Sequence, residues 1–378
     1  MQIAGQAQRG GAASLARAKA ARLLPGDHAP WFEAPALSGS PNYKFDSVAG
    51  RHVLMLFFGS TLFEGAGEAL SLVQRNRSLF DDRQACFFGV SIDPRDQKER
   101  SIEQQLPGIR YFLDYNVQVS GRFGATDFGG VFTPFWLVLD QALQVVASFP
   151  LSEGQEAIRT LRDCLEAPTQ DLVAPVLFVP RVFDPSFCRR LIEEYEKSGG
   201  EESGFMREVE GKTVLVTDPQ HKQRRDHLLD NDLLQKEALS AMNRRLSPAL
   251  AKAFNYCPTR VERHLVACYS PGAGHFRPHR DNSTKGTAHR RFAVTINLNS
   301  DEYSGGELRF PEFGRRLYKP PTGGALVFSC SLMHEALPVK AGRRFAYLPF
   351  LYDEQAAAIR EANNPHLGEG LGAYSRKG

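Results

Sequence analysis

The stretch Val266-Ala-Cys-Tyr-Ser-Pro-Gly-Ala-Gly-His-Phe-Arg-Pro-His-Arg-Asp281 decides the fold of the second half of the chain. The apolar run at residues 264–269 predicts a strand, and Pro271-Gly272 predicts a turn into the next extended segment. Further short apolar runs, separated by turns, occur at residues 292–298, 306–310, 325–328 and 344–350. Short strands at this spacing predict a β-rich domain of the jelly-roll type, a double-stranded β-helix. Helices are expected before it, at residues 187–197 and 232–253.

The motif His279-Arg280-Asp281 lies in the extended segment after that turn. Residues i and i+2 of an extended segment project to one face, so an imidazole and a carboxylate converge there. His334 follows 55 residues after His279, beyond the end of another predicted strand. Two histidines and one carboxylate form the facial triad of non-haem Fe(II) oxygenases. We therefore expect His279, Asp281 and His334 to be metal ligands and catalytic residues; the alternative is a surface pair and an unrelated core histidine.

Arg344, ten residues after His334, begins the last predicted strand. A guanidinium can hold a carboxylate through two parallel hydrogen bonds. The cosubstrate 2-oxoglutarate needs such a cation for its far carboxylate, because its keto-acid end chelates the iron. Arg343 is the alternative, since a shift of one residue would exchange the two. Three other histidines are expected outside the site: His264 in a strand, and His275 and His289 in loops.

The segments around these residues resemble the prolyl-hydroxylase branch of the 2-oxoglutarate/Fe(II) dioxygenases over about residues 175–355. The segments that carry the resemblance are Val266-Ala-Cys-Tyr269, Pro271-Gly272, His279-Arg-Asp-Asn282, Leu298-Asn299, Ser304-Gly-Gly-Glu-Leu308, Phe310-Pro311, His334-Glu335 and Arg344-Phe-Ala346. The resemblance implies hydroxylation of an unactivated C–H bond in a peptidyl, amino-acid-like or small-molecule substrate. Succinate and CO₂ would be co-products, with ascorbate as a further reductant. It also implies that Tyr269 faces the cosubstrate, as does Thr295 or Asn297.

The first half of the chain alternates between strands and helices, which predicts an α/β layer fold. Strands are expected at residues 53–58, 86–92, 135–139 and 144–149, and helices at 68–80, 97–105 and 153–165. The segments Gly26-Asp-His-Ala-Pro30, Phe45-Asp-Ser-Val48 and Thr133-Pro134 resemble the peroxiredoxin branch of the thioredoxin fold. That resemblance implies a cis peptide bond before Pro134.

The peroxidatic cysteine of that family follows the first core strand, where this chain reads Gly59-Ser-Thr-Leu-Phe-Glu-Gly-Ala-Gly-Glu68. A thiolate is the nucleophile in peroxide reduction, and serine or threonine does not replace it at neutral pH. We therefore expect a non-catalytic domain with Cys86 as a small buried apolar residue. Two alternatives remain: the domain recruits a protein partner or a second copy, or Cys86 or Cys164 serves a peroxide-linked redox function.

Composition limits the classes of partner. The net charge of +3 gives no global basic field that would attract nucleic acid. No apolar run approaches the roughly 18 residues of a membrane span. Six scattered cysteines without a C-x-x-C pair indicate neither a disulfide framework nor a zinc site, and fit a reducing, cytoplasmic compartment.

The expected organisation has five parts: a flexible leader (1–24), the thioredoxin-like domain (25–165), a linker (166–175), the dioxygenase domain (176–356) and a tail (357–378). Two segments are open. Residues 200–230 form either a surface loop or a lid over the iron. The basic residues 285–291 form either a solvated loop or a guide for an acidic substrate.

Overall fold

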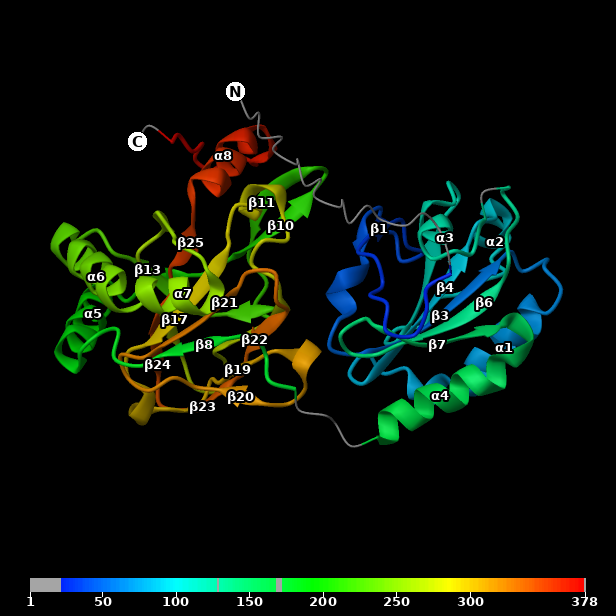
Figure 1. Cartoon of the computed structure of the whole chain (residues 1–378), viewed down its shortest axis with the longest axis horizontal. Coiled ribbons are helices and arrows are strands. Elements are labelled where there is room, and N and C mark those ends of the chain that lie inside the picture. The colour runs from blue at the N-terminus through cyan, green and yellow to red at the C-terminus, as the bar shows by residue number, and fades with distance from the viewer. Residues whose placement is uncertain (1–21, 128, 168–171, 377–378) are drawn as a thin grey trace, which may run out of the picture. The chain divides into compact units, whose positions relative to one another are not determined.

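The computed structural model describes residues 22–127, 129–167 and 172–376. The expected leader therefore lies outside the described residues except for its last three, and so do four residues of the expected linker. The chain forms two compact units that divide at Glu166 and Ala167 (Figure 1). In the described part, no helix is both long and apolar enough to cross a membrane.

The first unit is a five-stranded mixed sheet in the order β5-β4-β3-β6-β7 (Figure 1). Its strands are β3 (His52–Gly59), β4 (Ala85–Ser91), β5 (Ile109–Leu113), β6 (Phe135–Leu139) and β7 (Val145–Pro150). The first three run parallel, and β6 and β7 are antiparallel to their neighbours. A short hairpin, β1 (Glu33–Ala34) with β2 (Tyr43–Lys44), precedes them. β4 is buried along its whole length, which explains its continuous apolar sequence.

Helices complete the first unit: α1 (Ala66–Arg75), α2 (Pro94–Lys98), α3 (Gln118–Arg122) and α4 (Gly154–Glu166). Alternate residues of β3 explain how the sheet is covered. Leu54, Leu56 and Phe58 pack with α1 and α4 on one face. Phe57 belongs to the opposite face, where its ring stacks on that of Phe135 at 4.8 Å. The expected strands and the closing helix are confirmed, while β5 and α3 were not expected from the sequence.

Two expectations for the first unit are wrong. The helix expected at 97–105 is the short α2, which begins at the Asp93 N-cap and gives way to Arg100 in the left-handed region (φ 56°). The buried Asp96 carboxylate accepts from Ser91 Oγ at 2.6 Å, which ties α2 to the sheet end. In the described residues, the cis peptide bond precedes Pro107, not Pro134. Thr133 N donates to Ala125 O, so the chain enters β6 in extended form.

The second unit consists of two antiparallel sheets. The larger has the order β14-β25-β17-β24-β15-β13-β9, with β21 also paired to β17 and β8 to β21. Its strands are β8 (Leu177–Val179), β9 (Glu201–Glu202), β13 (Arg225–Leu228), β14 (Arg260–Glu262), β15 (Leu265–Tyr269), β17 (Phe292–Asn297), β21 (Ala325–Ser329), β24 (Arg344–Tyr347) and β25 (Phe350–Tyr352). The smaller has the order β12-β16-β22-β19-β20. Its strands are β12 (Lys222–Gln223), β16 (His275–His279), β19 (Leu308–Arg309), β20 (Leu317–Tyr318) and β22 (His334–Ala336). A two-stranded pair, β18 (Ser304–Gly305) with β23 (Val339–Ala341), is separate.

Strand alternation builds two cores on either side of the larger sheet. Ala267 and Tyr269 of β15 pack between the sheets with Leu308 and Ala336 of the smaller one. The intervening residues of the larger sheet face three helices, α5 (Pro185–Ser198), α6 (Asp232–Arg245) and α7 (Ser247–Phe254). Two sheets facing one another across an apolar core give the jelly-roll arrangement. The single helix expected at 232–253 is two helices, because Pro248 begins a new one at its first turn.

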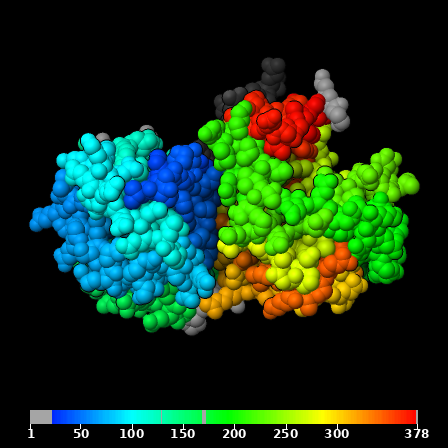
Figure 2. All heavy atoms as spheres, turned by 180° about the vertical axis from the view of Figure 1, so that it is seen from behind, coloured from blue at the N-terminus to red at the C-terminus, as the bar shows by residue number. Residues whose placement is uncertain are grey.

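The segment expected to be a loop or a lid contains short strands of both sheets and a separate hairpin. It contains a hairpin, β10 (Phe205–Val209) with β11 (Lys212–Val216), then β12, which pairs with the metal-triad strand β16. The C-terminal segment lies against this hairpin (Figure 2), where Gly368 N donates to Thr213 O at 2.8 Å. The last helix, α8 (Glu354–Ala362), spans the boundary expected at residue 356.

The basic segment 285–291 is held by a buried carboxylate and is not a solvated loop along its whole length. Glu262 accepts from His289 Nε2 at 2.7 Å and from Arg290 through both carboxylate oxygens, at 3.0 and 2.6 Å. Arg290 is only 7% exposed. Burial by itself raises the pKa of Glu262, but Arg290 and His289 outweigh it and hold that pKa well below its usual value. Arg290 is thus committed to an internal ion pair.

Glu262→Ala should destabilise the second unit by about 3–5 kcal/mol, because it leaves the Arg290 charge buried without its partner. Both tryptophans, Trp31 and Trp136, belong to the first unit. In urea unfolding, the circular dichroism transition of the second unit should therefore move to lower urea while tryptophan fluorescence does not. Glu196→Ala is the control, since its pair with Arg343 is exposed and should contribute less than about 1 kcal/mol. Equal shifts for both variants would contradict the expectation.

Candidate metal and cosubstrate site

The three triad residues meet at the pairing of β16 with β22. His279 lies directly opposite His334, and Asp281 follows two residues after the strand end. His279 Nε2 is 3.5 Å from Asp281 Oδ1, and His334 Nε2 is 3.4 Å from Asp281 Oδ2. One ligand atom from each residue lies within 4.8 Å of the other two. The structure thus brings together the residues that the motif predicted, with their donor atoms converging on one point.

A β-bulge in β16 sets the direction of the His279 side chain. Phe276 pairs with Ala336 and His279 with His334, so β16 has three steps where β22 has two. One extra residue in a strand shifts which side chains share a face. Pro278 lies in this irregular stretch, where a missing backbone N–H is tolerated. The Phe276 ring consequently stacks on the His279 ring, with centroids 3.4 Å apart.

The protonation states suit metal binding. The Nδ1 atoms of His279 and His334 lie 2.7 and 3.0 Å from the backbone oxygens of Arg277 and Leu332. A carbonyl only accepts, so each Nδ1 carries a proton and Nε2 is the nitrogen left to bind a metal. Burial, and then His334, lowers the pKa of His279 to about 4. Burial raises the pKa of Asp281, but the two histidines outweigh it and lower that pKa. Neutral imidazoles and an ionised carboxylate are the forms that bind Fe(II).

Arg344 is a buried cation with unused donors. Its side chain is 2% exposed, and its Nη2 donates to Asn297 Oδ1 at 3.4 Å. Its Nε and Nη1 have no hydrogen-bond partner among the described residues. The neighbouring Arg343 is half-exposed and pairs with Glu196. Unsatisfied buried N–H groups on a cation are costly, so Arg344, not Arg343, fits a ligand carboxylate.

The other expected cosubstrate residues lie around Arg344. Tyr269 of β15 pairs directly with Arg344 of β24, and its ring centroid is 4.9 Å from the guanidinium carbon. Thr295 and Asn297 are both buried, and as residues i and i+2 of β17 they share one face. Thr295 and Asn297 are therefore not alternatives, because both side chains lie on the same face of β17. Only Asn297 contacts Arg344 in a described hydrogen bond.

Sequence reasoning missed Arg224, whose Nη1 donates to the Tyr269 hydroxyl at 3.1 Å. The signal was the pattern Arg224-Arg225-Asp226, which places residues 224 and 226 on one face of a strand.

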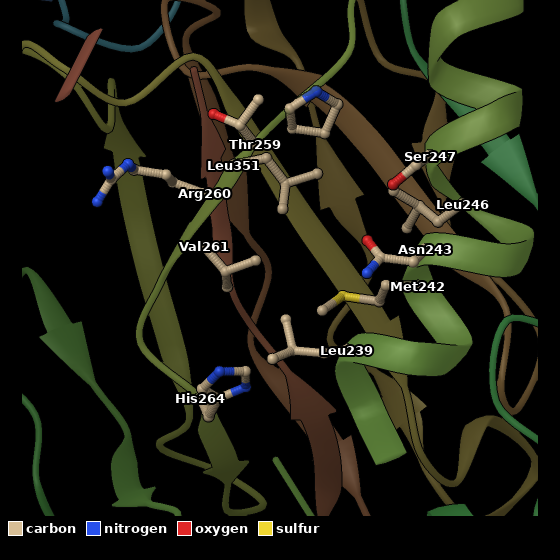
Figure 3. A pocket seen from close by; sticks show the side chains of 11 residues that line it. Leu239, Met242, Asn243, Leu246, Ser247, Thr259, Arg260, Val261, His264 and Leu351 are labelled. Carbon is tan, nitrogen blue, oxygen red and sulfur yellow. The ribbon is translucent and has the colours of Figure 1, made fainter. Parts of the chain in front are cut away.

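The remaining histidines lie outside the triad. His264 lines a separate cavity of about 330 Å³ between α6, α7 and β14, and no triad residue lines it (Figure 3). His275 is the first residue of β16 and was expected in a loop; its Nδ1 lies 2.7 Å from Ala273 O.

A second group of potential ligands, Glu194, His227 and Asp230, also converges within 4.8 Å. There Asp230 is exposed and Glu194 pairs with Lys197.

In the first unit, two side-chain hydrogen bonds hold the loop that lacks the peroxidatic cysteine. Ser60 Oγ donates to Asp93 Oδ2 at 2.8 Å, and Thr61 Oγ1 donates to Asp96 Oδ1 at 2.6 Å. Cys86 is buried within β4. Burial, and then Asp140, raises the pKa of Cys164. A raised thiol pKa disfavours the thiolate, which argues against the peroxide-linked alternative for Cys164.

Comparison with known proteins assigns a class to the second unit. Residues 264–352 match the sequence model of the 2OG-Fe(II) oxygenase superfamily, and the range contains the triad and Arg344. The C-terminal half therefore contains a region similar to the 2OG-Fe(II) oxygenases.

Individual relatives cover part of the chain. Human procollagen-lysine,2-oxoglutarate 5-dioxygenase 2 is 27% identical over 203 residues, 50% of this chain and 26% of that protein. PKHD-type hydroxylase PiuC of Pseudomonas aeruginosa is 27% identical over 184 residues, 45% of this chain and 75% of that protein. A solved prolyl hydroxylase from Trichoplax adhaerens, complexed with a hypoxia inducible factor peptide, gives a TM-score of 0.40 at 19% identity, covering 49% of this chain and 86% of that one. The chain spans about a quarter of the human protein and about half of the Synechococcus PKHD-type hydroxylases that it matches.

His279→Ala and His334→Ala should each weaken Fe(II) binding by more than about a hundredfold, because each removes a ligand nitrogen. Anaerobic calorimetric titration of the full chain with Fe(II) measures this. His275→Ala is the matched control from the same strand and should bind Fe(II) as the wild type does. Retained affinity in both ligand variants would show that the metal is held elsewhere.

Proposed function

We propose that the chain is a 2-oxoglutarate-dependent Fe(II) dioxygenase that hydroxylates an unactivated C–H bond. In this proposal His279, Asp281 and His334 hold the iron, and Arg344 holds the far carboxylate of 2-oxoglutarate. One observation carries the proposal: the fully buried guanidinium of Arg344, with two nitrogen atoms that lack a partner among the described residues, borders the same inter-sheet core as the converged triad. The family match over this region supports it.

The residues of the chain have separate roles in this chemistry. When bound, Fe(II) and 2-oxoglutarate supply the oxidising power, releasing succinate and CO₂. The triad presents two Nε2 atoms and one carboxylate from one side, so the opposite side stays accessible to cosubstrate and dioxygen. Phe276, Phe310 and Phe328 surround the histidine rings and keep water from them. Arg344 orients the cosubstrate through charge-assisted hydrogen bonds.

The proposed substrate is peptidyl, amino-acid-like or a related small molecule. The names of the relatives support hydroxylation as the reaction, and one of them acts on a lysine of procollagen. The proposed domains are a thioredoxin-like domain at residues 25–165 and an oxygenase domain that begins at residue 176 and extends beyond residue 356, because α8 spans that position. All six cysteines are free thiols, which fits a cytoplasmic location.

Arg344→Met should raise the KM for 2-oxoglutarate about a hundredfold or more, because two hydrogen bonds to a charged group are lost. Succinate release, followed by NMR with the full chain, measures the change. Arg343→Met removes the adjacent, exposed guanidinium and should leave the KM unchanged. A raised KM in Arg343→Met with an unchanged KM in Arg344→Met would mean that Arg343 binds the far carboxylate, and would contradict the assignment to Arg344.

A second function is proposed for the first unit, where exposed apolar side chains lie in the loop that lacks cysteine and next to Phe132 in the chain. This loop patch consists of Leu62, Phe63 and Val131, which are 69%, 40% and 61% exposed. Phe63 contacts the Phe132 ring at 5.8 Å, which joins the two loops. Exposed apolar clusters mark interaction sites. We propose that the loop patch recruits the protein that the oxygenase modifies.

The double variant Leu62→Ser, Phe63→Ser should lose proteins that the wild-type chain retains from a cell extract, because the apolar contact area is removed. Succinate release without added substrate should stay the same, since the iron site is untouched. Leu106→Ser, at an exposed leucine outside the loop patch, is the control. An identical set of retained proteins for all three would remove the recruiting role.

A further inference from the structure

Arg224 is a buried cation beside the cosubstrate pocket that the mechanism above leaves without a role. It lies where the chain passes from β12 in the smaller sheet to β13 in the larger sheet. Only 7% of its surface is exposed. A buried charge persists only where partners compensate its desolvation, so the partners of Arg224 indicate its role.

Hydrogen bonds fix the guanidinium on two sides. Nη2 donates to Asp226 Oδ2 at 2.6 Å and to Ser203 Oγ at 3.4 Å. Nη1 donates to the hydroxyl oxygen of Tyr269 at 3.1 Å. Burial alone lowers the pKa of Arg224, but Asp226 and Tyr269 outweigh it and the pKa is raised. The phenol of Tyr269 therefore faces a permanently charged donor.

This contact restricts what the Tyr269 hydroxyl can do. A guanidinium has no acceptor atom, so the phenol oxygen must accept from Arg224. The phenol keeps its own proton to donate, and no acceptor for it is found in the part of the chain that the structure describes. Tyr269 is paired with Arg344 across β15 and β24, and the guanidinium of Arg344 lies over its ring. The unassigned donor of Tyr269 and the unpartnered Nε and Nη1 atoms of Arg344 thus belong to neighbouring, directly paired residues.

We propose that Arg224 is a positioning residue that commits the Tyr269 hydroxyl to donate to the far carboxylate of 2-oxoglutarate. This inference rests on the proposed function. Arg224 does not touch the cosubstrate; it acts through the phenol, which it also polarises into a stronger donor. A ligand without the far carboxylate gains no affinity from this arrangement, because it has no acceptor for the Tyr269 hydroxyl. Arg224 therefore contributes to selection of a dicarboxylate cosubstrate.

The same bonds tie the segment 203–226 to the cosubstrate pocket. Ser203 Oγ accepts from Lys222 Nζ at 2.6 Å, and Ser203 and Asp226 are also hydrogen-bonded to each other. Arg224 is held by both. Ser203, Arg224 and Asp226 thus form one hydrogen-bonded group that connects this segment to the Tyr269 hydroxyl.

The test measures ligand affinity without turnover. The full chain is loaded anaerobically with Mn(II) and titrated by calorimetry with 2-oxoglutarate, or with pyruvate, which lacks the far carboxylate. Arg224→Met should raise the Kd for 2-oxoglutarate about ten- to a hundredfold and leave that for pyruvate unchanged. Tyr269→Phe should give the same selective loss. The double variant should be no weaker than either single variant, because both remove one interaction.

Controls separate this role from a structural one. Arg225→Met removes the next guanidinium, which donates to the backbone oxygens of Gly199 and Gly200 and not to Tyr269, and should bind both ligands as the wild type does. Arg224→Lys keeps a cation beside Asp226 but has no second nitrogen atom to donate to Tyr269. It should show the same selective loss, and it serves if Arg224→Met does not fold.

Three outcomes would overturn the inference: unchanged 2-oxoglutarate affinity in Arg224→Met, equal loss for both ligands, or additive effects in the double variant. Failure of the proposed function looks different. In that case the wild type would not bind 2-oxoglutarate, or Arg344→Met would bind it as tightly as the wild type. If Arg344→Met binds 2-oxoglutarate weakly and Arg224→Met binds it as tightly as the wild type, only the role of Arg224 is refuted.

Discussion

The pairing of β16 with β22 is the constraint on which the site depends. It sets His279 opposite His334, and the bulge before Pro278 turns the His279 ring onto Phe276 and toward Asp281. Arg280, between the two ligands, points away and bonds to Glu312 at 2.8 Å. A shift of one residue in this register would send every side chain of the strand to the other face. The site is therefore a property of strand register, not of an adaptable loop.

Arginine side chains are the buried cations of the inter-sheet space. Arg224, Arg290 and Arg344 are all buried, and burial, and then Arg224, lowers the pKa of Lys222 to about 6. Asp226 and Glu262 compensate two of the guanidiniums through direct hydrogen bonds. Arg344 has no carboxylate partner in a described ion pair. An interior built in this way favours a bound dianion, because the ligand supplies the missing negative charge. Cosubstrate selection and the stability of the loaded protein are thus linked.

Much of this could be predicted from local sequence. The motif at 279–281, the strand spacing and the buried runs of the first unit depend on neighbours along the chain, so pattern reasoning finds them. The preference for Arg344 over Arg343 needed the burial of each side chain, because Arg344 is buried and Arg343 is half-exposed. Arg224 was missed because its partner Tyr269 is 45 residues away and on another strand. The helix expected at 97–105 failed for a related reason: Asp96 bonds to Ser91 and Thr61, contacts that local polarity does not reveal.

The central claim is that one iron ion is held by His279, Asp281 and His334 with 2-oxoglutarate chelated beside it. Anaerobic addition of Fe(II) and 2-oxoglutarate to the full wild-type chain, followed by visible absorption, tests this most directly. The account predicts a weak metal-to-ligand charge-transfer band that requires both additions and saturates at one equivalent of iron. Absence of the band, with iron and 2-oxoglutarate both present in excess, would contradict it.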